Sequence, residues 1–193
     1  MNKRSKILNT TIRLFVEKDI KKTTMDDIAA RANVSKMTVY KYFYNKESLY
    51  ETVGREVLDH CYDALTEQYE SPHTAAQKMI GYTSVLVDFI AKGHMALCDE
   101  LGDLNEDVKG HVGQFQTNIK EIMIALIKEG KEDALIRKDI SNEYIYHYIN
   151  MGLYYFQHNA QYRNKMMHEP SFREEYMAFL WSHIFTDYSG FTS

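Results

Sequence analysis

The sequence predicts an all-α protein of about nine helices, with three short helices in front of a longer helical region. Apolar residues recur at spacings of three and four along most of the chain, and no convincing alternating strand interrupts them. Two prolines and nine glycines in 193 residues are too few for a many-stranded β protein. Apolar residues make up 45% and charged residues 26%, so we expect a folded core rather than disorder.

Capping residues divide this pattern into separate helices. Asp19 and Asn33 tolerate a left-handed backbone, so we expect helices to end there. Thr24 and Ser35 are good N-caps, so we expect new helices to begin there. The expected helices span residues 3–18, 24–32, 35–43, 45–69, 73–92, 94–103, 104–130, 141–162 and 170–187.

The net charge of −4 is distributed unevenly along the chain. Residues 1–50 hold eleven Lys and Arg against five Asp and Glu, whereas residues 51–193 hold twelve against 22. A basic front on an acidic body favours a polyanion as the partner of the front alone, because repulsion keeps the body away from it. A chance cluster of surface cations is an equal alternative on charge alone, so the choice of nucleic acid depends on the motif that follows.

Residues 24–43 show the pattern of a helix-turn-helix, two short helices separated by Asn33-Val34-Ser35. In this motif the second helix lies in the major groove and its first residues face the base edges. Lysine and threonine side chains hydrogen-bond to bases, and methionine contacts the thymine methyl group. The candidate base-contacting residues are Lys36, Met37 and Thr38, with Lys41 one turn later.

The phosphate backbone has its own candidate partners in the same segment. Helix N-termini at Thr24 and Ser35 offer unpaired N–H groups and the positive end of a helix dipole. Tyr40, Tyr42 and Lys46 add two hydroxyls and an ammonium group, and such contacts set register rather than sequence preference. The alternative for the two tyrosines is an ordinary half-buried aromatic role.

The same segment resembles the signature of the TetR family of bacterial transcriptional regulators. The resemblance is carried by residues 28–43, IAARANVSKMTVYKYF, and by residues 46–49, KESL. It covers residues 5–53 almost without gaps. Beyond about residue 55 the likeness is one of length and helix count only.

The resemblance implies a DNA-binding domain at residues 1–46 and a helical effector-binding and dimerisation domain at residues 47–193. It also implies two sets of DNA contacts, with a plain surface charge as the alternative for Arg31. Positions that match family phosphate contacts are Thr24, Tyr40, Tyr42 and Lys46, and positions that match contacts to bases or the nearby backbone are Arg31, Lys36, Met37, Thr38 and Lys41. Asp19 and Asn33 replace the usual glycines, and both residues are compatible with positive φ.

The last two expected long helices, 141–162 and 170–187, carry more apolar surface than one small domain needs. We expect a symmetric four-helix interface between two copies, because one short helix reads too few bases and a dimer reads two half-sites. The resemblance implies the same dimer. The candidate interface residues are Ile145, Gly152, Phe156, Phe179, Trp181 and Ile184, and core packing is their alternative role.

Fifteen tyrosines and ten methionines are unusual in a chain of this size, and most follow residue 50. These side chains suit a cavity for a flat or hydrophobic ligand. The candidate ligand-binding residues are Tyr62, Tyr82, Phe89, Phe115, Ile119, Met123, Tyr148, Met151 and Tyr155, and plain packing is the alternative for most of them.

Other classes of function have no motif in this sequence. GxSxG, Walker-type and GxGxxG patterns are absent, so we expect no enzyme and no cofactor. HExxH and cysteine-rich clusters are absent, and His147 and His158 are about 16 Å apart along a helix, so we expect no metal site. Short apolar runs, the lack of a signal-peptide pattern and two cysteines predict a cytoplasmic protein without a membrane span.

The expected function is therefore that of a dimeric repressor of the TetR type. Double-stranded operator DNA is the expected partner of the front domain, and a small effector in the rear domain is expected to release the DNA. The alternative is a DNA-binding protein whose rear domain docks a protein partner instead of a small molecule.

Overall fold

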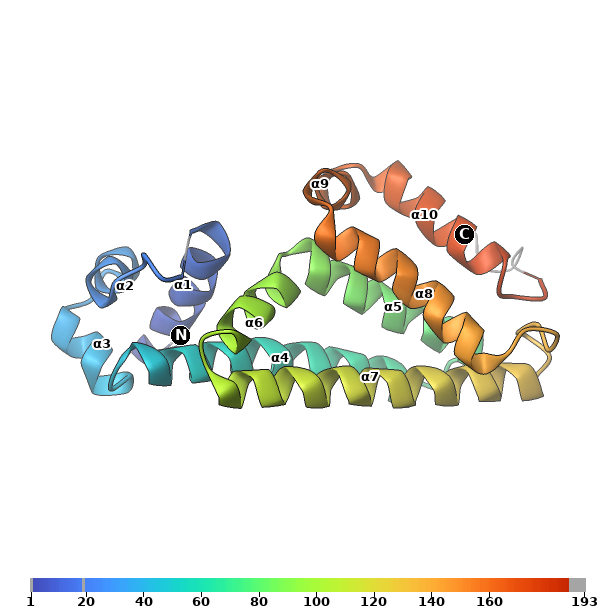
Figure 1. Cartoon of the computed structure of the whole chain (residues 1–193), viewed down its shortest axis with the longest axis horizontal. Helices are drawn as coiled ribbons and strands as arrows, with labels where there is room; N and C mark the ends of the chain where they lie inside the picture. The colour runs from blue at the N-terminus through green and yellow to red at the C-terminus, as the bar shows by residue number, and fades with distance from the viewer. Residues whose placement is uncertain (1, 19, 188–193) are drawn as a thin grey trace. The chain divides into compact units, whose positions relative to one another are not determined.

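The computed structural model describes residues 2–18 and 20–187, and within these ranges it confirms the predicted all-α class (Figure 1). The described residues hold no strand beyond an isolated antiparallel bridge. None of the described helices is both long and apolar enough to cross a membrane. The helices are α1 (Lys3–Glu17), α2 (Met25–Ala32), α3 (Lys36–Tyr42), α4 (Lys46–Glu70), α5 (Ala75–Ala91), α6 (His94–Gly102), α7 (Glu106–Glu132), α8 (Asn142–His158), α9 (Ala160–His168) and α10 (Pro170–Ser182).

Contacts divide the chain into two compact units. Unit 1 consists of Met1–His60 and His94–Gln114, and unit 2 consists of Cys61–Gly93 and Phe115–Ser193. The long helices α4 and α7 contribute residues to both units. The predicted boundary between residues 1–46 and 47–193 divides a DNA-binding domain from an effector-binding and dimerisation domain, whereas the two units are defined by contacts. The functional boundary therefore stays a prediction.

Unit 1 is built around the buried faces of its three short helices. α1 packs on α2, α2 packs on α3, and α1 also contacts α6. Ile7, Ile28, Val39 and Phe43 are buried at 2% exposure or less, and each such side chain stabilises the fold by about 1.5–3 kcal/mol. This core fixes the orientation of α3, because Val39 lies on the inner side of a helix only seven residues long.

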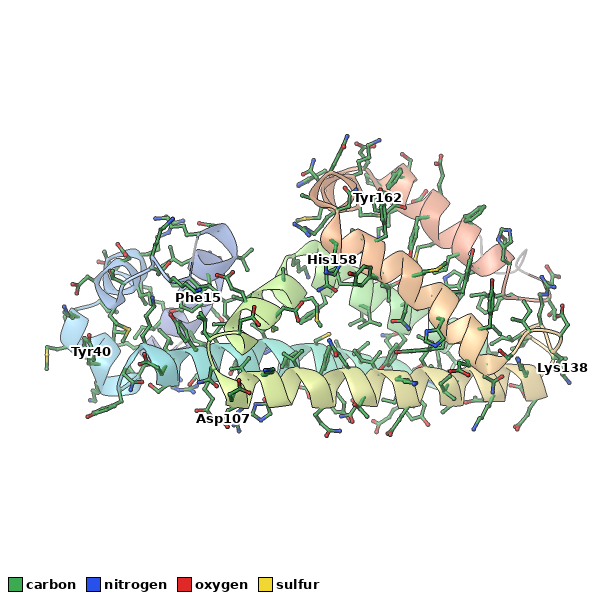
Figure 2. All side chains as sticks on the ribbon, in the orientation of Figure 1. Phe15, Tyr40, Asp107, Lys138, His158 and Tyr162 are labelled. Atoms are coloured by element: carbon green, nitrogen blue, oxygen red, sulfur yellow. The ribbon has the colours of Figure 1, made fainter. Side chains whose placement is uncertain are left out.

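Unit 2 is organised around α5, which contacts both α8 and α9. α5 is buried on most of its sides, and Tyr82 and Thr83, adjacent in sequence, are both almost fully inaccessible. An ion pair between Arg173 of α10 and Asp88 of α5, with an N–O distance of 2.7 Å, adds a polar link across the unit. Tyr162 of α9, labelled in Figure 2, packs edge-on against Phe172 of α10 with ring centroids 5.0 Å apart, so an aromatic contact joins the two helices.

The predicted helix at residues 141–162 is two helices in the structure. α8 ends at His158, and Asn159 has an extended backbone with φ −115° and ψ 101°. The Asn159 side chain accepts a hydrogen bond from the amide of Tyr162 at 2.9 Å, so it begins α9 as an N-cap. No helix is predicted at residues 163–168, and α9 raises the number of helices in the described residues from about nine to ten.

The last helix is also shorter than predicted, ending at Ser182 rather than near residue 187. Beyond it the chain pairs with the turn after α7 instead of continuing as a helix. Arg137 N–H donates to the carbonyl of Ile184 at 3.1 Å, and Thr186 N–H donates to the carbonyl of Leu135 at 3.0 Å. These bonds satisfy backbone groups that a longer helix would have satisfied internally. Asp19, predicted to end the first helix, lies outside the described residues.

Candidate nucleic-acid interface

The turn between α2 and α3 has the geometry of a helix-turn-helix. Asn33 ends α2 with φ 52° and ψ 55°, the left-handed conformation that the sequence predicts for it. Ser35 then caps α3, since its hydroxyl accepts a hydrogen bond from the amide of Thr38 at 3.1 Å. Three residues therefore reverse the chain, and the predicted cap at Ser35 is confirmed.

The α2 N-terminus is closed by a reciprocal capping box. Asp27 N–H donates to the Thr24 hydroxyl oxygen at 3.1 Å, and Thr24 N–H donates to the Asp27 carboxylate at 2.8 Å. The Thr24 hydroxyl also donates to that carboxylate at 2.7 Å, and these bonds hold the pKa of Asp27 below its usual value. The predicted cap at Thr24 is confirmed, and its hydroxyl proton is already used within the chain.

The outer side of α3 is exposed, and we call α3 the reading helix from here on, after the role that the sequence predicts for it. Met37 is 77% exposed, Lys36 and Lys41 are exposed, and Tyr40 projects from the same helix (Figure 2). Thr38 is half-buried, and its hydroxyl lies 2.8 Å from that of Ser35. The reading helix thus presents two cations, a thioether and a phenol to solvent, all of which are donors or apolar groups suited to DNA.

The other predicted DNA-contacting residues also differ in exposure. Thr24, Arg31 and Tyr42 are exposed, whereas Lys46 is half-buried. The ammonium group of Lys46 donates to two backbone carbonyls of its own chain, at 2.8 and 3.1 Å. The structure therefore brings all nine predicted residues into unit 1, with Lys46 as the one whose charge is directed inward.

Two carboxylates that the sequence analysis did not single out pair with predicted DNA-contacting cations. Asp26 lies 2.9 Å from Lys36 Nζ, and Glu17 lies 3.3 Å from a guanidinium nitrogen of Arg31. The hydrogen bond and the negative charge of Asp26 raise the pKa of Lys36 above its usual value. Both pairs are solvent-exposed, so each is weak and exchangeable. An acid in the first turn of a helix also interacts favourably with the helix dipole, so the position of Asp26 in the sequence does not by itself indicate a pair with Lys36.

A further exposed aromatic residue follows the reading helix. Tyr44 is 85% exposed in the short connection between α3 and α4. Tyr44 is not among the residues predicted to contact DNA. Tyr44 adds a phenolic hydroxyl to the exposed groups of unit 1.

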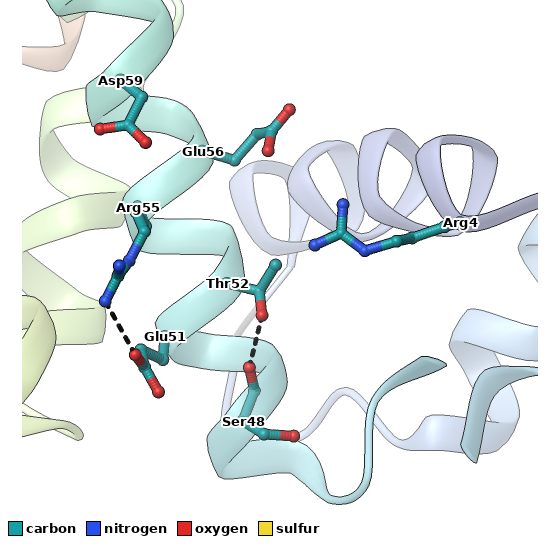
Figure 3. Close-up of a pocket in the computed structure, with 7 residues that line it drawn as sticks. All are labelled: Arg4, Ser48, Glu51, Thr52, Arg55, Glu56 and Asp59. Atoms are coloured by element: carbon teal, nitrogen blue, oxygen red, sulfur yellow. Dashed lines mark hydrogen bonds and ion pairs between the residues drawn. The ribbon is translucent and has the colours of Figure 1, made fainter. Parts of the chain in front are cut away.

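An open polar groove of about 310 Å³ lies elsewhere in unit 1, between α1 and α4 (Figure 3). Arg4 comes from α1, and the remaining lining residues come from α4. Glu51, Glu56 and Asp59 outnumber the cations there, and Glu51 pairs with Arg55 at 3.0 Å. This groove is therefore unsuited to phosphate, in contrast to the surface around the reading helix.

The predicted ligand-binding residues of unit 2 differ widely in burial. Four are buried, two are half-buried and three are exposed, and Phe89 and Phe115 pack with ring centroids 5.8 Å apart. In that order the residues are Tyr82, Phe89, Phe115 and Met123, then Ile119 and Tyr148, then Tyr62, Met151 and Tyr155.

The predicted dimer residues lie mostly inside their own chain. Ile145, Phe156, Trp181 and Ile184 are buried at 2% exposure or less, which is the core role that the sequence left open as the alternative. A Cβ atom at Gly152 would collide with the Tyr176 hydroxyl, so this glycine makes room for a neighbouring helix of the same chain. Phe179 is 63% exposed.

Comparison with known proteins shows which family the N-terminal segment matches. Residues 7–53 match the model of the bacterial regulatory proteins of the tetR family. The biofilm operon icaADBC HTH-type negative transcriptional regulator IcaR of Staphylococcus epidermidis is 27% identical over 128 residues, 63% of this chain and 67% of IcaR. The N-terminal segment of this chain therefore matches the tetR family of bacterial regulatory proteins.

Two further comparisons extend the TetR-family likeness beyond the N-terminal segment. The HTH-type transcriptional repressor KstR2 of Rhodococcus jostii is 23% identical over 151 residues, 76% of this chain and 74% of KstR2. The structure of the ketosteroid transcriptional regulator KstR2 of Mycobacterium tuberculosis has a TM-score of 0.73 at 16% identity and covers 96% of both chains. These relatives are transcriptional regulators, and the likeness in fold extends over nearly the whole chain.

Removing the carboxylate beside Lys36 should strengthen binding to DNA of any sequence. We expect Asp26→Asn to raise the affinity for a mixed-sequence duplex about two- to fivefold, because it frees Lys36 and removes one negative charge near the phosphates. Fluorescence anisotropy at 0.1 M salt measures the change. Glu106→Gln, which breaks a comparable exposed pair with Lys109 outside the helix-turn-helix, is the matched control and should change nothing. An unchanged or lower affinity of the Asp26 variant contradicts the expectation.

Proposed function

We propose that this protein is a repressor of the TetR family that binds operator DNA as a homodimer and releases it when a small apolar or aromatic effector binds in unit 2. The reading helix carries this proposal. Val39 on its inner side and Phe43 just after it are buried in the core. The exposed side chains of Lys36, Met37 and Lys41 are therefore held on one rigid helix. We assign the protein no catalytic role and place it in the cytoplasm with the DNA it regulates.

The relatives support the direction of regulation. IcaR is described as a negative regulator and KstR2 as a repressor, and each resembles this chain over about three fifths or more of its length. Repression follows simply from occupancy, because a protein bound at an operator blocks the use of that DNA. A gain of effector affinity in the DNA-free state of typically 1–3 kcal/mol is enough to release it.

A second copy is needed because the reading helix is short. α3 has seven residues and reaches only a few base pairs, whereas a dimer reads two half-sites about 34–36 Å apart or a multiple of that spacing. A twofold axis between the copies then imposes a palindromic operator.

A stripe of exposed side chains on α8 is the proposed contact surface for that second copy. Tyr144, His147, Met151, Tyr154 and His158 are all exposed and follow one another at spacings of three, four, three and four residues. Tyr144, Met151 and Tyr154 are between 63% and 66% exposed. Heptad spacing of large side chains is typical of a helix that packs along a second helix, and isolated domains rarely leave so much apolar surface in solvent.

The effector part of the proposal rests on an unpaired polar group in an apolar core. Thr83 is fully buried on α5, and its hydroxyl has no hydrogen-bond partner within the described part of the chain. Tyr82, Phe89 and Met123 are buried in the same unit. A buried hydroxyl without a partner costs about 1–3 kcal/mol, so a ligand that bonds to it gains that energy. An apolar or aromatic molecule with one polar group fits this environment.

Loss of the outward side chains of the reading helix should abolish selective DNA binding. We expect Lys36→Ala combined with Met37→Ala to weaken binding to an operator selected from a random duplex pool by about 10–100-fold, with little effect on folding because both residues are exposed. Gel-shift titration measures this. Lys138→Ala, at an exposed turn of unit 2, is the control and should bind like the wild type. Equal affinity of the double variant would refute the assignment of the reading helix.

A charge in the α8 stripe should separate the two copies. Tyr154→Glu is expected to cost the dimer about 2 kcal/mol or more, because a carboxylate then replaces a large aromatic side chain at the proposed contact between the two copies. Light scattering after size exclusion should show a monomer at concentrations where the wild type is a dimer. Lys128→Glu, an exposed charge reversal on α7, should leave the mass unchanged. A dimeric Tyr154 variant would place the interface elsewhere.

A compound that fills unit 2 should both stabilise the protein and loosen its grip on DNA. We expect such a compound among steroids and planar aromatic alcohols, judged by a higher melting temperature together with a weaker gel shift. Thr83→Val, which replaces the hydroxyl by a methyl group, should reduce the compound's stabilising effect while DNA binding persists. If every stabilising compound leaves DNA affinity unchanged, the effector half of the proposal fails.

A further inference from the structure

Lys46 lies in the first turn of α4, and its ammonium group bonds to its own chain. Nζ donates to the carbonyl of Ile20 at 2.8 Å and to the carbonyl of Lys21 at 3.1 Å. It also lies 5.5 Å from the centroid of the Tyr50 ring, one turn further along α4. Two hydrogen bonds and one cation–π contact therefore hold the group, and such contacts are stronger for a charged donor than for a neutral one.

The two carbonyls belong to the turn that leads into α2. The Ile20 carbonyl also accepts a hydrogen bond from the amide of Thr23 at 3.2 Å, and the next residue, Thr24, caps α2. Ile20 is fully buried, which anchors the turn in the core of unit 1. Lys46 adds a charged side-chain donor to these two carbonyls from 26 and 25 residues away.

The same turn of α4 is held against α1 by an aromatic contact. Tyr50 is buried, and its ring packs edge-on against Phe15 with centroids 5.8 Å apart. The start of α4 is thereby joined at two points, to the end of α1 through Tyr50 and to the following turn through Lys46. A displacement of this part of α4 has to move the turn with it or break both links.

We propose that Lys46 is a positioning residue that fixes the α1–α2 turn, and with it the Thr24-capped start of α2, relative to α4. This role goes beyond the proposed function. The family resemblance matches Lys46 to a phosphate contact, whereas the proposal gives Lys46 a role within its own chain. Only the DNA-binding readout below rests on the proposed function. The role is chemically distinct from that of Lys36 and Lys41, which are exposed cations of the reading helix.

A contact between Lys46 and a phosphate would require Nζ to leave its carbonyl partners. If Nζ moved to a phosphate, Lys46 would give up its bonds to the carbonyls of Ile20 and Lys21, and the first of these bonds is part-buried. Lys36 loses only an exposed carboxylate when it turns to DNA. The ammonium group has a third proton, but its position is set by the first two bonds.

The salt dependence of DNA binding separates positioning from phosphate contact. We expect Lys46→Met to weaken binding about tenfold at every salt concentration, with the slope of log affinity against log salt unchanged, because no phosphate contact is lost. Lys41→Met, the matched control on the reading helix, should lower that slope by about one. Lys46→Arg, which keeps a charged donor, should restore most of the affinity. Amide exchange of Thr23 should be about tenfold faster in Lys46→Met and normal in the other two variants.

A measurement on the wild type covers the case in which Lys46→Met does not fold. Through-hydrogen-bond NMR couplings from Lys46 Nζ to the carbonyl carbons of Ile20 and Lys21 should be detectable in the free protein. They should persist in the complex with the selected duplex.

Two results overturn the proposal. One is a slope lowered by about one in Lys46→Met with normal exchange at Thr23, which makes Lys46 a phosphate contact. The other is the absence or loss of the NMR couplings in the DNA complex. If wild type and all variants bind no duplex at all, the proposed function fails instead, and the exchange rates and the couplings of the free protein still decide the role of Lys46.

Discussion

The left-handed turn at Asn33 is the constraint on which the DNA-facing surface depends. Asparagine sustains φ of 52° more readily than most residues with a side chain, so α2 ends there and Ser35 begins the reading helix two residues later. The buried Val39 then fixes the rotation of that helix about its axis, because a helix of seven residues has room for only one inward face. The exposure of Met37 on the opposite side is a consequence of this turn and this single core contact.

The cations of this surface differ in how firmly their own chain holds them. Lys36 and Arg31 pair with exposed carboxylates, and such pairs contribute about 0–1 kcal/mol, so phosphate or a base replaces the carboxylate at little cost. Lys46 donates to two backbone carbonyls and lies over the Tyr50 ring, so its transfer to DNA breaks more contacts. Glu17 and Asp26 also weaken the attraction of these two cations to phosphate at any DNA sequence. Contacts to specific bases then account for a larger share of the binding free energy.

Short-range signals in the sequence were enough for the all-α class and for the helix-turn-helix. The caps at Thr24 and Ser35 were predictable because capping depends on residues within one helical turn. α9 was missed because Asn159 ends one helix and caps the next without glycine or proline between them. The bonds of Lys46 were beyond sequence reasoning, since any residue offers a backbone carbonyl and the partners lie 25 and 26 positions away. Which residues contact DNA, effector or a second copy stays a prediction.

α8 explains why core and interface residues were hard to separate by periodicity. Large apolar side chains lie on both of its sides, with Ile145 and Phe156 buried and Met151 and Tyr154 exposed. The inner side packs toward α5, the helix that carries the unpaired Thr83 hydroxyl, and the outer side carries the heptad stripe. A helix is rigid on the scale of one side chain, so a ligand that displaces its inner face displaces the outer face by a similar amount. Effector binding and dimer geometry would then be coupled through one helix, without a longer chain of contacts.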